Sequence, residues 1–343
     1  MTGINRRRFV RTGALGTLAG TLGDRALGAE SDLKKGPPPL PGEGAFTMAV
    51  LPDTQMYCMR HPDGFLAQTR WLVEQKEARR LQAVMHLGDI THLNTEAQWE
   101  VAQKAMRQLD GHLPYFMVPG NHDYSEGGRA TDRTTRLDDY FPRSSFENLP
   151  TFGGTYDREP DRMTNSFHLL TVGGREFLVL CLEFGPRADV VRWANEVVAK
   201  HAKRETILLT HAYTYFDDSR YDWKTKGPKQ SWNPHSYGVA KASGGDVMDG
   251  EELWQELVSR HENFILTFNG HVLNDGLGRV SSKTPGGRTV HQMLVNFQMK
   301  PKGGDGWLRL LEFTADRKLE IYDYSPTLDL TNHGPQNRLS LEW

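Results

Sequence analysis

Five apolar stretches of this chain end directly in residues that can bind metal ions or move protons. These residues are Asp53, Asp89, Asn121-His122-Asp123, His211 and His271. Each stretch has the composition of a buried strand, and ligands of open α/β sheets bind at the carboxyl ends of such strands. A single aspartate there could cap a helix, and a single histidine could be a satisfied core residue. Five such junctions instead predict a metal centre, because carboxylates, an amide oxygen and imidazoles together suit first-row divalent ions.

Alternating strand and helix patterns would position these residues. Apolar runs predict strands at residues 46–51, 83–87, 115–118, 206–209 and 264–268. Apolar residues at helical spacing predict helices within residues 65–73, 99–109, 190–198 and 253–258. Two further apolar runs flank Gly173-Gly174 and predict a hairpin. The order strand, helix, strand, helix, strand in the first part is typical of parallel βαβ units.

Taken together, these motifs resemble the calcineurin-like metallophosphoesterase superfamily. The matching motifs are Asp53-Thr54-Gln55, Gly88-Asp89, Gly120-Asn121-His122-Asp123, His211 and Gly270-His271. The resemblance covers most of residues 45–275. It implies an α/β fold of the four-layer αββα sandwich type, with mixed sheets and a two-metal site.

The resemblance also implies a role for each motif residue. Asp89 would bridge two metal ions, and Asp53 would belong to the first of them. The ligands of the second ion would be Asn121, His211 and His271.

The implied activity is metal-dependent hydrolysis of a phosphoric ester, either a monoester or a diester. A metal-bound hydroxide would attack phosphorus, and two metal ions would hold the phosphate oxygens. His122 would be the acid that assists the leaving group, and Asp123 would orient its ring. The substrate would be a phosphorylated small molecule or a phosphodiester.

Two positions depart from the family pattern, and both affect the first metal. Gln55 stands where many members have histidine, and Leu273 stands where the last motif commonly has a second histidine. The first site would then have Asp53, Asp89 and the Gln55 carbonyl oxygen, a set that is weak or takes Mn, Mg or Ca. The second site keeps its imidazoles and is expected to prefer Zn, Fe or Mn. His235 is a candidate replacement ligand.

A long aromatic segment follows His211 directly. Loops of this length inside compact domains are usually lids or binding surfaces, so residues 213–238 are expected to border the active-site cleft. The candidate substrate contacts are Tyr213, Trp232 and Tyr237. The alternative is a surface loop that buries its own aromatic side chains.

The N-terminus has the pattern of an export signal. Residues 5–11 (Asn-Arg-Arg-Arg-Phe-Val-Arg) resemble a twin-arginine motif, a short apolar stretch follows, and Gly28-Ala29 suits a cleavage site. We therefore expect a periplasmic or otherwise exported protein that uses the twin-arginine export machinery. The apolar stretch is too short and too glycine-rich to be a stable membrane span.

The remaining organisation is expected to be simple. Residues 1–29 would be the signal peptide, 30–44 a Pro/Gly-rich linker, 45–325 the metallophosphoesterase domain and 326–343 a C-terminal tail. The formal net charge of -2 and the absence of a basic stripe indicate no nucleic-acid partner. The two cysteines, Cys58 and Cys181, could pair or stay free.

The sequence is also compatible with a second class of function. With a degraded first site, the protein could be an exported metal-binding or ligand-binding module without turnover. Leu273 favours that interpretation. The intact pair His122-Asp123 favours an enzyme, because a binding site has no evident need for a proton-transfer pair.

Overall fold

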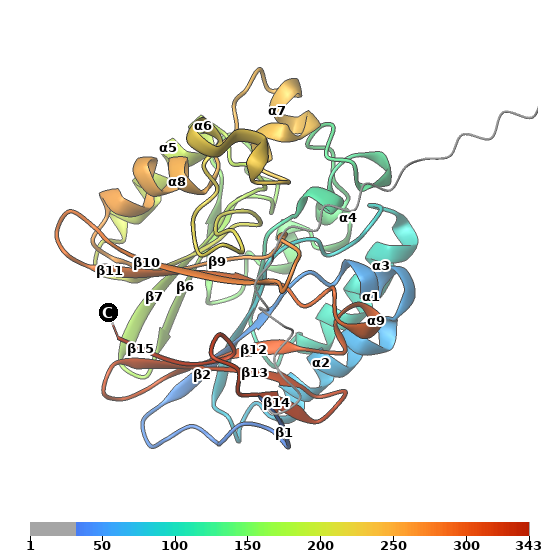
Figure 1. Cartoon of the computed structure of the whole chain (residues 1–343), viewed down its shortest axis with the longest axis vertical. Coiled ribbons are helices and arrows are strands. Elements are labelled where there is room, and N and C mark those ends of the chain that lie inside the picture. Colours follow the sequence, from blue (N-terminus) through green and yellow to red (C-terminus); the bar gives the residue numbers. More distant parts are fainter. Residues whose placement is uncertain (1–31, 343) are drawn as a thin grey trace, which may run out of the picture.

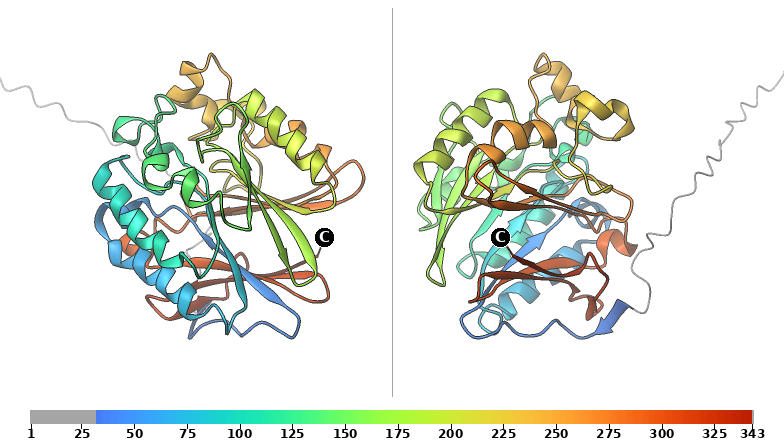
Figure 2. Two further views of the ribbon diagram at one scale, coloured as in Figure 1. Left: turned by 180° about the vertical axis from the view of Figure 1, so that it is seen from behind. Right: turned by 60° about the vertical axis from the view of Figure 1, so that its left-hand side comes forward.

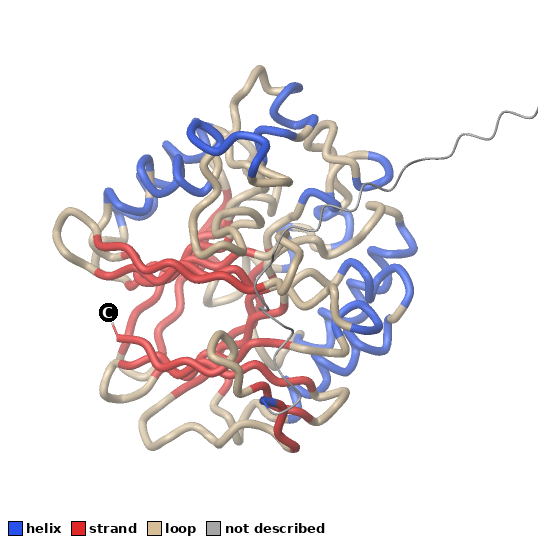
Figure 3. Tube along the Cα trace, in the orientation of Figure 1, coloured by secondary structure: helices blue, strands red, loops and turns tan. Residues whose placement is uncertain are grey.

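The computed structural model describes residues 32–342, so the predicted signal peptide, residues 1–29, lies outside the described residues. Two mixed β-sheets lie face to face in the middle of the molecule, and helices cover the outer face of each sheet (Figures 1, 2 and 3). The four-layer αββα sandwich expected from the sequence is therefore confirmed.

The first sheet has eight strands in the order β1-β14-β13-β12-β2-β3-β4, with β15 also paired to β13. The three strands that end in site residues are parallel neighbours: β2 (Phe46–Leu51), β3 (Leu81–His86) and β4 (Tyr115–Met117). The others are β1 (Leu33–Lys35), β12 (Leu308–Phe313), β13 (Lys318–Ser325), β14 (Leu330–Asn332) and β15 (Arg338–Glu342). Because β2, β3 and β4 are parallel, their carboxyl ends meet at one edge.

The second sheet has seven strands in the order β10-β11-β9-β8-β7-β6-β5. Its parallel core is β7 (Arg175–Cys181), β8 (Glu205–Leu209), β9 (Phe264–Asn269) and β11 (Thr289–Val295). The outer strands are β5 (Phe152–Thr155), β6 (Ser166–Val172) and β10 (Leu277–Lys283). β6 and β7 form the predicted hairpin, and both turn residues, Gly173 and Gly174, have positive φ, which suits the turns that join twisted strands.

Helices pack their apolar stripes on the outer faces of the sheets. The first sheet is covered by α1 (Gln55–Arg60), α2 (Pro62–Glu74) and α3 (Glu96–Met106), and the second by α5 (Ala188–Lys200) and α8 (Gly250–Glu256). Trp99, Ala102 and Met106 of α3 are buried against the first sheet. The short helices are α4 (Leu137–Tyr140), α6 (Trp223–Lys226), α7 (Gly238–Ala242) and α9 (Pro301–Gly304).

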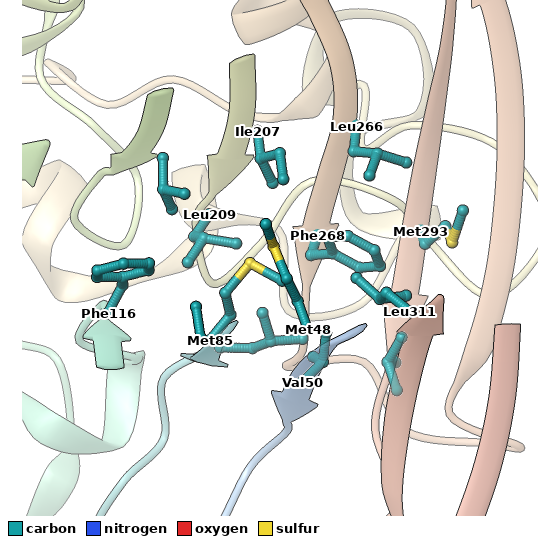
Figure 4. Close-up of a cluster of buried hydrophobic side chains, with 14 of the residues drawn as sticks. Met48, Val50, Met85, Phe116, Ile207, Leu209, Leu266, Phe268, Met293 and Leu311 are labelled. Carbon is teal, nitrogen blue, oxygen red and sulfur yellow. The ribbon is translucent and has the colours of Figure 1, made fainter. Parts of the chain in front are cut away.

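The main core lies between the two sheets. Figure 4 shows side chains from both sheets meeting there, among them Met48, Val50, Met85, Ile207, Leu209 and Phe268. All six residues of β2 are buried, because one face meets the other sheet and the opposite face meets the helices. Strands covered on both sides are continuous apolar runs, which explains why the sequence indicates them clearly.

Both ends of the described chain add strands to the first sheet. Residues 326–343, expected as a tail, contribute β14 and β15, while β1 lies within the expected linker and pairs with β14. β1, β14 and β15 are short and largely polar, and β10 is longer but also largely polar, so none has the apolar run that indicates a buried strand. Among residues 32–342, none of the helices has the length and apolar character to span a membrane.

A buried ion pair joins these C-terminal strands to the core. Arg309 and Asp323 make two hydrogen bonds of 2.7 Å each, and both side chains are almost fully buried. Arg309 also donates to the Gln336 carbonyl at 2.9 Å, and Asn337 donates to Asp323 at 2.7 Å. The pair therefore holds residues 336–337 against β12 and β13.

Replacing one partner of this pair should destabilise the fold strongly. Asp323→Ala leaves the Arg309 guanidinium buried without its counter-ion, which should lower the free energy of unfolding by about 3–5 kcal/mol. The control Asp316→Ala removes an exposed carboxylate at the β12–β13 turn, and we expect a change within about 0.5 kcal/mol. Urea denaturation measures both values, and equal effects would contradict the role given to the buried pair.

Candidate metal centre

The structure brings the predicted ligands together at the carboxyl ends of strands from both sheets. Asp89, His211 and His271 each offer one ligand atom, and these atoms lie within 4.8 Å of one another. Asp53 joins them, because its Oδ1 accepts a hydrogen bond from the His271 main-chain N–H at 3.0 Å. Asp89 is tied to the β4 junction in the same way, since the His122 main-chain N–H donates to its Oδ1 at 2.9 Å. The cluster thus lies where the two sheets meet.

Glycines make room for the two carboxylates. A Cβ atom on Gly120 would lie 2.2 Å from Asp89 Oδ1, and one on Gly270 would lie 2.0 Å from Asp53 Oδ2. Any larger residue would push these oxygens out of the centre. Asp53, Asp89 and His271 themselves have positive φ, a strained conformation that clusters at functional sites.

Main-chain carbonyls orient the two histidines of the cluster. His211 donates from Nδ1 to the Leu87 carbonyl at 2.7 Å, and its Nε2 faces Asp89 Oδ1 at 3.1 Å. His271 donates from Nε2 to the Trp232 carbonyl at 2.7 Å, which leaves Nδ1 free. Such contacts fix the tautomer of a ligating histidine. The sequence does not indicate that Leu87 and Trp232 accept these hydrogen bonds, because a carbonyl has no residue-type signature.

Burial and mutual charge set the protonation of the cluster. Burial raises the pKa of Asp53 well above its usual range. Burial alone would raise the pKa of Asp89, but the neighbouring His211 holds that pKa well below its usual range. Burial opposes the charged form of His211 too, yet Asp89 raises its pKa to about 9. Burial lowers the pKa of His271 to about 3, so this ring is a neutral lone-pair donor.

Buried oxygen atoms without hydrogen-bond partners show that a cation suits this place. They are Asp53 Oδ2, Gln55 Oε1 and Asn121 Oδ1, all in the predicted ligand set. Leaving a buried polar atom unsatisfied costs about 1–3 kcal/mol, so three together indicate a missing partner. The Gln55 amide donates from Nε2 to Gln298 Oε1, which fixes its orientation and leaves its oxygen available. Carboxylate, amide and imidazole donors fit divalent metal ions.

His122 lies beside this centre with its ring held in place. Its Nδ1 donates to the His92 carbonyl at 2.9 Å, and its ring stacks on the His92 ring with centroids 4.6 Å apart. The opposite nitrogen, Nε2, takes no part in this hydrogen bond.

The prediction that Asp123 orients His122 is wrong. The Asp123 carboxylate accepts hydrogen bonds from the main-chain N–H groups of Ile90, Thr91 and Gly120 at 3.0, 2.7 and 2.8 Å. Burial, with Asp89 nearby, raises its pKa to about 6. Its oxygens are directed at the backbone, so Asp123 joins the loops after β3 and β4, and the His92 carbonyl orients His122.

His235 belongs to a different group of side chains. Its Nε2 contacts Glu252 Oε2 at 2.7 Å, Asp249 lies beside them, and its ring stacks on Trp223. His235 therefore does not lie where it could replace the second histidine of the last motif, at which this chain has Leu273.

The three aromatic residues expected to contact substrate differ in position. Tyr237 packs near His271, with ring centroids 5.8 Å apart, and Trp232 reaches His271 through its carbonyl. Tyr213 instead is fully buried against the outer face of the second sheet. The prediction that Tyr213 contacts substrate is therefore wrong, because its ring has no exposed surface.

The two cysteines are both buried and free. Cys181 lies in the core between the sheets, and Cys58 lies in the cluster under α2 and α3. The open question of their pairing is thus answered by their placement in different layers.

Enlarging Gly270 should displace the Asp53 carboxylate from the candidate metal centre. In Gly270→Ala the new methyl group would meet Asp53 Oδ2 at 2.0 Å, so we expect less bound divalent ion per chain after dialysis against Mn²⁺ or Zn²⁺. Gly42→Ala is the control, because its nearest neighbour would be 4.0 Å away. Elemental analysis measures both, and parental metal content in Gly270→Ala would contradict the close approach.

The chain is 27% identical over 320 residues to the uncharacterized protein YvnB of Bacillus subtilis (strain 168), a match that covers 88% of this chain and 22% of that protein. The chain therefore spans about a fifth of the length of this relative.

Two solved structures are similar at low identity. Purple acid phosphatase PPD1 from yellow lupin (Lupinus luteus) seeds has a TM-score of 0.49 and 13% identity, over 84% of this chain and 53% of that chain. GAP50, the anchor in the inner membrane complex of Plasmodium, has a TM-score of 0.46 and 11% identity, over 87% of this chain and 90% of that chain.

The model of the calcineurin-like phosphoesterase family matches residues 46–300, which contain all five strand-end motifs. The chain belongs to the calcineurin-like phosphoesterase family.

Proposed function

We propose that this protein hydrolyses a phosphoric ester at a divalent metal centre, with His122 as the proton donor. The observation that carries the proposal is the set of buried, unpartnered oxygens beside an oriented imidazole. Membership of the family supports metal-dependent phosphoester hydrolysis in general. The substrate is a phosphorylated small molecule or a phosphodiester.

The residues present would hold one or two ions. Asp89, Asn121, His211 and His271 would hold the one that suits Zn, Fe or Mn. Asp53, Asp89 and the Gln55 oxygen would hold the one that suits Mn, Mg or Ca. When bound, such ions neutralise the negative charge of the phosphate and orient its oxygens.

The chain itself supplies proton transfer and placement. With Nδ1 donating to the His92 carbonyl, the protonated His122 ring presents its other proton from Nε2. The leaving oxygen takes that proton as its bond to phosphorus breaks. The stacked His92 ring keeps His122 from rotating away. Tyr237 and Trp232 lie beside His271 and would border a bound substrate.

The alternative is a binding module without turnover. The observation that favours it is the reduced first site, where Gln55 and Leu273 replace two imidazoles. It differs from the enzyme in one measurable outcome, which is turnover by protein that has bound metal.

Removing the His122 ring should abolish most catalysis while sparing the metal. In His122→Ala we expect kcat to fall by about 10²–10⁴-fold with unchanged metal content, because general acids contribute rate enhancements of that size. His112→Ala is the matched control, an exposed histidine before β4 where His122 follows it. The assay is hydrolysis of p-nitrophenyl phosphate and bis-p-nitrophenyl phosphate with added Mn²⁺, Zn²⁺, Mg²⁺ or Ca²⁺. If the metal-loaded parent protein hydrolyses neither ester with any ion, the enzyme hypothesis is wrong and the binding-module hypothesis is favoured.

We also propose export through the twin-arginine machinery to the periplasm or beyond. The supporting observation is the Arg6-Arg7 pair ahead of a short apolar stretch. Replacing both by lysine should retain the protein in the cytoplasm of a bacterial host, measured by cell fractionation. The control replaces Lys34 and Lys35 by arginine, downstream of the predicted cleavage site. Unchanged export of the Arg6→Lys, Arg7→Lys variant would contradict the proposal.

A further inference from the structure

We propose that Asn233 and Asp249 are positioning residues for the metal ligand His271, acting through the main-chain carbonyl of Trp232. The aromatic segment after His211 would then be a fixed support of the metal centre. The inference rests on the metal centre of the proposed function, and its test measures metal binding instead of turnover.

The first link is the hydrogen bond between His271 and the Trp232 peptide. His271 Nε2 lies 2.7 Å from the Trp232 carbonyl oxygen, which can only accept. Both residues have positive φ, 75° for His271 and 65° for Trp232. Each such conformation costs about 1–3 kcal/mol and persists only where surrounding contacts over-determine it. The contact therefore needs an anchor on the Trp232 side.

Asn233 supplies that anchor at the next residue. Its side chain is completely buried, donates from Nδ2 to Asp249 Oδ2 at 2.9 Å, and accepts from the His235 main-chain N–H at 3.0 Å. Because both ends of the amide are engaged, the side chain has one orientation. The peptide between Trp232 and Asn233 is consequently held in place, and so is the carbonyl that His271 uses.

Asp249 connects this anchor to the packed layers. Its Oδ1 accepts from the main-chain N–H groups of Glu251 and Glu252 at 3.2 Å each, which caps α8. Its Oδ2 also accepts from the Trp223 main-chain N–H at 2.6 Å. α8 in turn buries Leu253 against the second sheet. A continuous set of contacts thus runs from the sheet core to His271.

Helix capping alone does not account for this arrangement. The two N–H groups of α8 bind Oδ1 of Asp249. A helix cap does not require the buried Asn233 side chain that binds Oδ2. A second anchor, His235 Nε2 to Glu252 Oε2 at 2.7 Å, fixes the same segment two residues later. The segment is therefore held at two positions, Asn233 and His235, that follow the residue whose carbonyl orients His271.

The test compares metal binding by Asn233→Ala and by a matched variant. Groups that orient metal ligands typically contribute 10–100-fold in affinity, so Asn233→Ala should bind Zn²⁺ and Co²⁺ about 10–100-fold more weakly. The visible absorption of bound Co²⁺ should also change, because it reports ligand geometry. The control is Asn195→Ala, a half-buried amide that joins α5 to the Glu256 carbonyl of α8 and accepts from His261. It should lose stability but keep the parental affinity and spectrum.

Each outcome decides the inference. Weaker binding and a changed Co²⁺ spectrum in Asn233→Ala alone support it. Parental binding in Asn233→Ala, or an equal loss in Asn195→Ala, overturns it while the metal centre stands. A parent protein that binds neither ion overturns the metal centre and this inference together. If Asn233→Ala does not fold, Asn233→Ser keeps a small polar side chain but shortens it away from Asp249, and the same losses are expected.

Discussion

Unpaired polar atoms buried at the meeting edge of two sheets are the constraint on which the site depends. Asp53, Gln55 and Asn121 each bury an oxygen that has no hydrogen-bond partner. In a low-dielectric interior such atoms are costly unless a partner satisfies them. A divalent cation satisfies several such atoms at once, and main-chain N–H groups already bind Asp89 Oδ1 and Asp53 Oδ1.

The buried oxygens repel one another, so the local structure must hold them close together. Gly120 and Gly270 let the backbone approach the carboxylates, and left-handed residues turn the side chains inward. Carbonyls of Leu87 and Trp232 choose the nitrogen that each imidazole presents. Strain of this kind is retained only where packing on all sides enforces it, and the two sheets with their helices provide that packing.

The two halves of the centre are unequal. The half with His211 and His271 has ligands from the second sheet, each oriented by a carbonyl. The half around Asp53 has only oxygen donors, with the Gln55 side chain held by Gln298. Hard oxygen ligands and imidazoles favour different ions. The presence of Gln55 and Leu273 therefore explains why different metals are proposed for the two halves.

The sequence by itself determined the strands that carry the site and the residues at their ends. Strands buried on both faces must be apolar, and each stops at a polar ligand, so both features are visible along the chain. The tertiary structure decided what depends on through-space contacts. In the folded chain Asp123 accepts hydrogen bonds from the backbone, and Tyr213 is buried in the core. His235 contacts Glu252, and His122 donates to the His92 carbonyl. Short strands such as β14 and β15 also needed the tertiary structure, because short polar strands are defined by their partners.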